Sequence, residues 1–185
     1  MRHNKTTLGF TMVELLVVLG IFSVMTGVVL GKYRTYNTNA LFANASEDIV
    51  LALRQAQVYG VGVKGSSGNF DVPYGVYFNT GANSISLFAD GNSDRVFTTT
   101  EDTGLVNSGA VWNSSISIFS LSCGGAACLG NKASVTFKRP NPDAFISDTA
   151  GLGTSKSYLT IIVKDSNTSK TATVTITNAG QISLQ

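Results

Sequence analysis

The sequence predicts an α+β fold, in which one long N-terminal helix lies on a head built from an antiparallel β-sheet. Three observations lead to this prediction. An apolar run comes near the start of the chain, and apolar residues then recur at spacings of three and four. After residue 68 the hydrophobic pattern changes to a period of two. A helix followed by many strands is typical of α+β domains whose helix covers one face of a sheet.

The first predicted element is a helix long enough to cross a membrane. Residues 10–30 read FTMVELLVVLGIFSVMTGVVL, a run of 21 residues with Glu14 as its only charge. At a rise of 1.5 Å per residue the run spans about 31 Å, the thickness of a bilayer's hydrocarbon core. It is followed by the basic and aromatic residues Lys32, Tyr33, Arg34 and Tyr36, which suit a membrane interface. A plain signal anchor accounts for the hydrophobicity but not for Glu14.

Glu14 requires a positive partner, because an ionised carboxylate within a bilayer costs roughly 2–3 kcal/mol or more. Beyond position 9 the first basic residue of the chain is Lys32, about 27 Å from Glu14 along a helix. Cleavage between Gly9 and Phe10 would create a new α-amino group. In a neighbouring subunit, that group can supply the missing positive charge.

This N-terminus resembles the class III signal of type IV pilins and type II secretion pseudopilins. The shared features are a short basic leader, the sequence Gly9-Phe10-Thr11, the position of Glu14 and the apolar helix. The resemblance implies that a prepilin peptidase cuts after Gly9 and methylates Phe10, and that Glu14 pairs with an adjacent subunit's N-terminus during assembly. It also implies a pilin-like fold and, as partners, other pilin or pseudopilin subunits.

The resemblance implies a location as well. Before assembly the chain is expected to cross the inner (cytoplasmic) membrane once, with its head on the periplasmic or extracellular side. After assembly it belongs to a periplasmic or cell-surface filament.

Removal of the leader takes away Arg2 and Lys5, so that Lys plus Arg falls from 13 to 11 and equals the 11 acidic residues.

The N-terminal signal and the hydrophobic periodicities predict that the chain divides into four segments. Residues 1–9 are the cleaved leader, residues 10–31 the transmembrane and assembly half of the helix, residues 32–62 its head-packed half, and residues 63–185 the β-rich head. The helix is expected over residues 10–60 and ends at Gly60-Val61-Gly62. Its head-facing stripe is predicted to contain Leu41, Ala45, Ile49, Ala52, Leu53 and Ala56.

Strands are predicted wherever the period of two returns. Residues 74–78 and 84–88 flank a turn and indicate a hairpin. Further strands are expected at residues 115–121, 133–138, 158–164, 171–177 and 181–184. The segment Val135-Thr136-Phe137 before Pro140, and a last hairpin closing on Gly180, resemble the H-class minor pseudopilin and related minor pilins.

Composition argues against most enzyme and nucleic-acid functions. The only histidine is His3 and there are two cysteines, which excludes ordinary structural zinc sites and Ser-His-Asp or Cys-His catalysis by the body of the protein. Lys138-Arg139 is the only adjacent basic pair, whereas nucleic-acid binding normally shows a basic stripe. The sequence therefore predicts a structural subunit of a type IV pilus or secretion pseudopilus and not an enzyme. The alternative is a DNA-uptake or adhesive minor pilin whose head binds DNA or a surface.

The two cysteines are expected to form a disulfide. Cys123 and Cys128 flank a Gly-rich loop, and thiols of an exported head are normally oxidised. A redox-active pair usually has C-x-x-C spacing, which this pair lacks. Closing so short a loop is expected to shape the loop more than to stabilise the fold.

A second candidate site lies at residues 90–101, where oxygen-bearing residues follow the spacing of a 12-residue calcium loop. No cofactor is required by the predicted function, but this loop is a candidate for a bound calcium ion. Arg95 stands at the sixth position, where such loops have glycine, and it brings a positive charge. A solvated, Asx-rich turn is the alternative. The expected ligands are Asp90, Asn92, Asp94, the Val96 carbonyl, Thr98 and Glu101.

Overall fold

The computed structural model describes residues 9–62, 64–66, 68–101, 110–148 and 155–185, so that most of the predicted leader, residues 1–8, lies outside the described residues. Helix α1 extends over Met12–Val61, and nine strands follow it among the described residues. The predicted α+β class is confirmed. The chain divides into two compact units, one up to Ala40 and the other Leu41–Gln185. This division does not test the predicted membrane boundary at residue 31.

In the second unit, α1 buries one face in the core of the head. The predicted stripe is correct except at its start, where Leu41 is 38% exposed and Phe42 is buried instead. Each residue turns about 100° around a helix, and Phe42 therefore lies nearer the middle of the stripe than Leu41 does. The buried residues of this face are Phe42, Ala45, Ile49, Ala52, Leu53 and Ala56.

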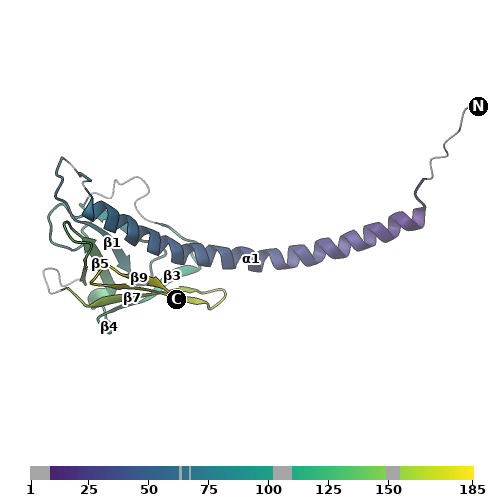
Figure 1. Ribbon diagram of the computed structural model, residues 1–185. Coiled ribbons are helices and arrows are strands. Elements are labelled where there is room, and N and C mark those ends of the chain that lie inside the picture. The colour runs from purple at the N-terminus through teal and green to yellow at the C-terminus, as the bar shows by residue number, and fades with distance from the viewer. Residues whose placement is uncertain (1–8, 63, 67, 102–109, 149–154) are drawn as a thin grey trace, which may run out of the picture. The chain divides into compact units, whose positions relative to one another are not determined.

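The first sheet has four antiparallel strands in the order β2-β1-β5-β6. Its members are β1 (Tyr74–Asn79), β2 (Ser86–Ala89), β5 (Lys132–Phe137) and β6 (Ala144–Ser147). The predicted hairpin is confirmed, with Val76 opposite Leu87 in β2. Strand β6 was not predicted. Figure 1 shows the second half of α1 running along the strands of the head.

Both faces of this first sheet are covered. On one face Val76, Val135 and Ile146 lie in the core that also contains the buried face of α1. On the other face the ring of Phe97 stacks on Tyr77, with centroids 4.6 Å apart, and meets Phe88 edge to face at 5.2 Å. The segment after β2 therefore folds back over the sheet, which explains why burial along β1 does not alternate.

The second sheet has five antiparallel strands in the order β4-β3-β7-β8-β9. They are β3 (Ile116–Cys123), β4 (Ala126–Ala127), β7 (Tyr158–Asp165), β8 (Thr171–Thr177) and β9 (Ile182–Leu184), and a 3-10 turn, Leu129–Asn131, follows β4. The sequence predicted one sheet, whereas the structure has two. Periodicity identifies strands but does not say which strands pair, and here β3 pairs with β7, which is distant in sequence, as well as with β4.

A buried polar contact joins α1 to the segment before β3. The indole Nε1 of Trp112, which is 9% exposed, donates a hydrogen bond to Asp48 Oδ2 at 3.1 Å. The backbone N–H of Trp112 donates to the Asn83 carbonyl at 2.8 Å. Trp112 thus belongs to the core, and Asp48 holds it there.

Candidate functional site

The predicted processing residues lie at the exposed start of the described chain. Gly9 and Phe10 precede α1 and have no regular secondary structure, and the Phe10 side chain is 83% exposed. Apart from its two chain neighbours, no described residue has an atom within 4 Å of the place where a Cβ on Gly9 would sit. The peptide bond between them is therefore open to an enzyme.

Glu14 lies in the first turn of α1, where it has a local structural role. Its backbone N–H donates a hydrogen bond to Thr11 Oγ1 at 3.2 Å, as expected when Thr11 caps the helix. The spacing Thr11-x-x-Glu14 is that of a capping box, and a carboxylate in the first turn interacts favourably with the helix dipole. Sequence reasoning missed this cap, although the spacing indicates it.

The apolar start of α1 presents its side chains outward. Every large apolar residue from Met12 to Leu30 is at least 53% exposed in the described chain. The hydroxyls of Ser23 and Thr26 donate to carbonyls of the preceding turn at 2.9 and 2.8 Å, so that their polar atoms are satisfied within the helix. By length and composition α1 can cross a membrane. Such a surface needs lipid or other helices around it.

Three of the predicted calcium ligands converge at the end of β2. Asp90, Asp94 and Glu101 each place a carboxylate oxygen within 4.8 Å of the others. Asp90 is 0% exposed. Its Oδ2 accepts a hydrogen bond from the Arg95 N–H at 2.9 Å, and Glu101 Oε2 accepts one from the Thr98 N–H at 2.8 Å. The second oxygens, Asp90 Oδ1 and Glu101 Oε1, are buried and have no hydrogen-bond partner within the described chain.

The other three predicted ligands are placed differently. Asn92 exchanges two hydrogen bonds with Asp94, through its Oδ1 at 3.0 Å and its Nδ2 at 2.9 Å. The Val96 N–H donates to Asp94 Oδ1 at 2.9 Å, and this contact holds the Asp94 carboxylate in place. Thr98 lines a cavity of about 540 Å³ together with Asn92 and Glu101. This cavity places solvent space next to the cluster.

The environment of the cluster makes two of its carboxylates, Asp90 and Glu101, harder to ionise. Burial is the main cause that raises the pKa of Asp90, and the charge of Asp94 raises it further. Burial also raises the pKa of Glu101 to about 7, with additional repulsion from Asp90 and Asp94. The negative charges of Asp90 and Glu101 therefore disfavour each other, and a proton or a cation between them would relieve this repulsion.

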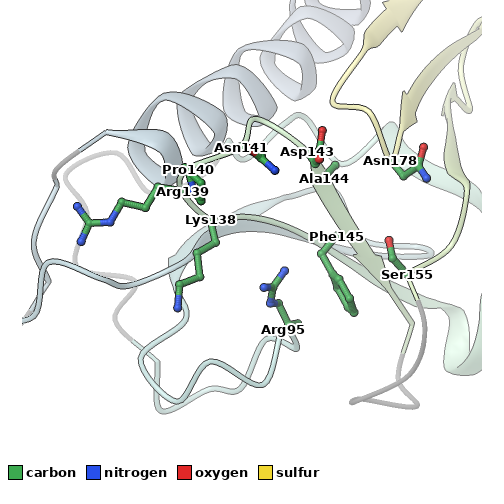
Figure 2. A pocket seen from close by; sticks show the side chains of 10 residues that line it. All are labelled: Arg95, Lys138, Arg139, Pro140, Asn141, Asp143, Ala144, Phe145, Ser155 and Asn178. Carbon is green, nitrogen blue, oxygen red and sulfur yellow. The ribbon is translucent and has the colours of Figure 1, made fainter.

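The structure corrects the expected effect of Arg95. Its guanidinium lies over the Phe145 ring, 4.6 Å from the centroid, and lines a different pocket, as Figure 2 shows. Its backbone has a φ of 67°, the left-handed conformation that glycine adopts most easily. Arg95 thus makes the turn that the sixth position requires, while its side chain stacks on Phe145.

Cys123 and Cys128 form a disulfide, as the sequence predicts. The bond closes the tight connection from β3 to β4, where Cys123 pairs with Ala126. Gly124 and Gly125, the two residues between Cys123 and Ala126, have φ values of 63° and 93°. A two-residue hairpin turn needs such positive φ values, and glycine adopts them easily. The bond thus constrains a local loop.

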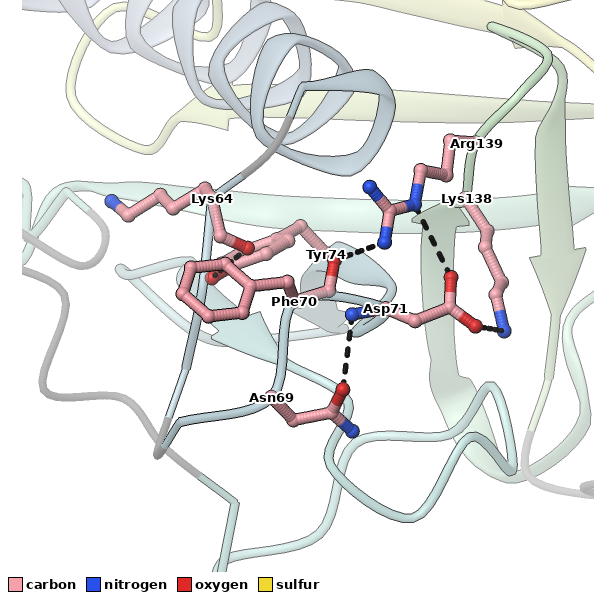
Figure 3. Close-up of polar contacts among 7 residues, drawn as sticks. All are labelled: Lys64, Asn69, Phe70, Asp71, Tyr74, Lys138 and Arg139. Atoms are coloured by element: carbon pink, nitrogen blue, oxygen red, sulfur yellow. Dashed lines mark hydrogen bonds and ion pairs between the residues drawn. The ribbon is translucent and has the colours of Figure 1, made fainter.

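Both residues of the adjacent basic pair form ion pairs with one acid, Asp71. Lys138 Nζ lies 3.1 Å from Asp71 Oδ2, and Arg139 Nε lies 3.3 Å from Asp71 Oδ1. Arg139 Nη2 also donates to the Phe70 carbonyl at 2.6 Å, as Figure 3 shows. These contacts fasten the segment before β1 to the end of β5, so that the pair serves the fold.

Comparison with known proteins bears on the N-terminus. Residues 4–30 match the family model of the prokaryotic N-terminal methylation motif. No curated protein and no solved structure matches the chain. The chain thus carries a type IV pilin-like signal, which supports its being a substrate of a prepilin peptidase and fits a membrane-anchored precursor. The match does not extend into the head.

Proposed function

We propose that this chain is a structural subunit, a minor pilin or pseudopilin, of a type IV pilus or a type II secretion pseudopilus. Prepilin peptidase processes it, and it assembles with other subunits through its N-terminal helix. The observation that carries the proposal is the methylation motif at residues 4–30, which coincides with the exposed cleavage position and the apolar start of α1.

The proposed mechanism is physical and involves no catalysis by the chain. Removal of the leader leaves a positive amine on Phe10, four residues before Glu14. Glu14 of one subunit pairs with this amine of its neighbour, which compensates the charge that otherwise stands alone in an apolar environment. The exposed apolar side chains of α1 exchange lipid contacts for contacts with other helices as the filament grows.

The N-terminus of the protein from its native membrane tests processing. We expect intact-mass and peptide mass spectrometry to show a chain that begins at N-methylated Phe10. A Gly9→Val variant should remain uncut, since the branched side chain hinders the cleavage position. A wild-type chain that retains the leader beside active peptidase would contradict the proposal.

Two variants separate the assembly role of Glu14 from its capping role. Glu14→Ala removes the carboxylate, and Thr11→Ala removes the hydroxyl that caps the helix but leaves Glu14 in place. We expect both to insert into the membrane, and only Glu14→Ala to lose at least tenfold in its recovery from sheared filaments. Equal losses in the two variants would show that Glu14 acts through the helix end.

The finer assignment rests on the head. Its irregular strand order favours a minor subunit, and the resemblance of Val135-Thr136-Phe137 and the Gly180 turn to the H class leads us to propose the secretion pseudopilus first. The alternative DNA-binding role finds less support, because Lys138 and Arg139 both pair with Asp71. DNA retention by the chain that weakens steeply with salt would favour that alternative.

A further inference from the structure

The loop after β2 holds three acids in an arrangement that its own residues do not neutralise. Asp90, Asp94 and Glu101 place oxygens within 4.8 Å of one another. Buried carboxylates normally have hydrogen-bond donors or cations around them, because burial of an uncompensated charge is costly. Here Asp90 is 0% exposed, and its Oδ1 is buried without a hydrogen-bond donor in the described chain.

The described residues supply no cation to this cluster. The ion pairs among them join Lys138 and Arg139 to Asp71, and Lys156 to Asp148. Arg95 is the nearest basic residue in sequence, and its guanidinium lies on the Phe145 ring. A solvated turn, the other interpretation of this sequence, does not fit an acid that is 0% exposed. A bound cation would supply the positive charge that the described residues do not bring to these three acids.

We propose that the loop of residues 90–101 binds one calcium ion through carboxylate oxygens of Asp90, Asp94 and Glu101. A donor set made of oxygen alone favours a hard cation over zinc or copper. Calcium accepts six to eight oxygens in flexible geometry, and the adjoining cavity has room for the waters that complete its shell. Magnesium demands a stricter octahedron, which one short loop with three carboxylates does not provide.

The ion would fasten the loop that covers the outer face of the first sheet. Between the ligands, the Phe97 N–H donates to Ser134 Oγ at 3.2 Å, and the Ser147 hydroxyl donates to the Arg95 carbonyl at 2.6 Å. Phe97 also packs on Tyr77 and Phe88. Calcium would thus link the end of β2 to a segment that is anchored on β5 and β6, and it would stabilise the head.

The test uses the full chain in detergent micelles, stripped of metal with EGTA and then titrated calorimetrically with calcium chloride. We expect one ion per chain, with a Kd in the range of about 10⁻⁵ to 10⁻³ M typical of sensor and extracellular sites. At saturating calcium the thermal midpoint of the head should rise by about 5 °C or more. Magnesium chloride should bind at least tenfold more weakly.

Variants distinguish a metal site from a merely structural cluster. Glu101→Gln and Asp94→Asn should weaken calcium binding at least tenfold, whereas Glu47→Gln, which changes an exposed acid on α1, should bind like wild type. In EGTA the Glu101→Gln head should unfold at or above the wild-type temperature, because one repelling charge is gone. Absence of binding up to about 5 mM calcium, above the range of extracellular sites, would overturn the proposal. Unchanged affinity in Glu101→Gln, or equal affinity for magnesium, would also overturn it.

Discussion

Gly60 lies where the end of α1 closely approaches Phe137 of β5, and we predict that Gly60→Ala destabilises the head. A Cβ at this position would lie 2.7 Å from the carbonyl carbon of Phe137 and 2.8 Å from its Cβ, and closer still to its carbonyl oxygen. The Gly60 carbonyl also accepts the Arg139 N–H at 2.9 Å. The clash is with backbone atoms, so that rotation of a side chain cannot relieve it.

Two opposing effects set the magnitude. Helix propensity alone would make alanine more stable than glycine by about 1 kcal/mol. Overpacking a close contact costs about 1–3 kcal/mol, and a backbone clash belongs at the upper end of that range. We therefore expect a net loss of about 1–2 kcal/mol, which corresponds to a thermal midpoint about 2–8 °C lower for a domain of this size.

Thermal unfolding followed by circular dichroism in micelles measures this effect. The matched control is Gly31→Ala on the same helix, where the added Cβ has no described atom within 4 Å apart from its chain neighbours and the adjacent helix backbone. The control should leave the midpoint of the head unchanged. A Gly60→Ala midpoint at or above that of wild type would refute the close approach of α1 to β5.

Three further predictions concern the head. Replacing both Cys123 and Cys128 by Ser should lower the free energy of unfolding by about 2 kcal/mol, since the disulfide closes a short loop. Denaturant titration of this variant and of the oxidised wild-type chain measures the difference. An unchanged midpoint with an unchanged slope would contradict the prediction. Trp112→Phe should cost about 1 kcal/mol through its lost hydrogen bond to Asp48, and unaltered thermal unfolding would show that the bond contributes nothing. For Asp165, burial raises the pKa, but hydrogen bonds from Thr168 and the Asn167 N–H outweigh burial and leave the pKa below its ordinary value of 3.8. The folded state therefore gains stability from the Asp165 carboxylate above pH 3.8 and loses it as the pH falls through the lowered pKa. In Asp165→Asn, the free energy of unfolding should fall less steeply as the pH is lowered through this range. The same pH dependence in the variant and in wild type would contradict the lowered pKa of Asp165.

The sequence predicted the elements of the fold better than their pairing. The ends of α1 differ from the expected helix by no more than two residues, because a long apolar stripe and a terminal glycine mark them clearly. Burial alternates along all eight residues of β7 and along the last five of β8, and both strands were predicted closely. Strand β4, with two residues, is too short to produce a pattern, and the division into two sheets depends on contacts distant in sequence.

The candidate calcium loop shows the same limit at the level of side chains. Spacing alone identified Asp90, Asp94 and Glu101, the three acids that the fold brings together. It could not show that Asp90 becomes fully buried, which follows from the position of this residue at the end of β2, where its N–H donates to the Pro73 carbonyl. It also could not show that Arg95 turns its charge onto Phe145, since that ring comes from the unpredicted strand β6.

The N-terminal methylation motif and the carboxylate cluster of the head depend on different parts of the chain. The methylation motif is a linear pattern in the unit up to Ala40, and its match includes no residue of the head. The carboxylate cluster lies in the unit Leu41–Gln185 and exists only when β2 and the following loop have folded. A head variant such as Glu101→Gln should therefore be cut and methylated normally, and any loss of filament incorporation that it shows must arise after processing. Defects at Gly9 or Glu14 should leave calcium binding by the head intact, so that failure of one proposal leaves the other standing.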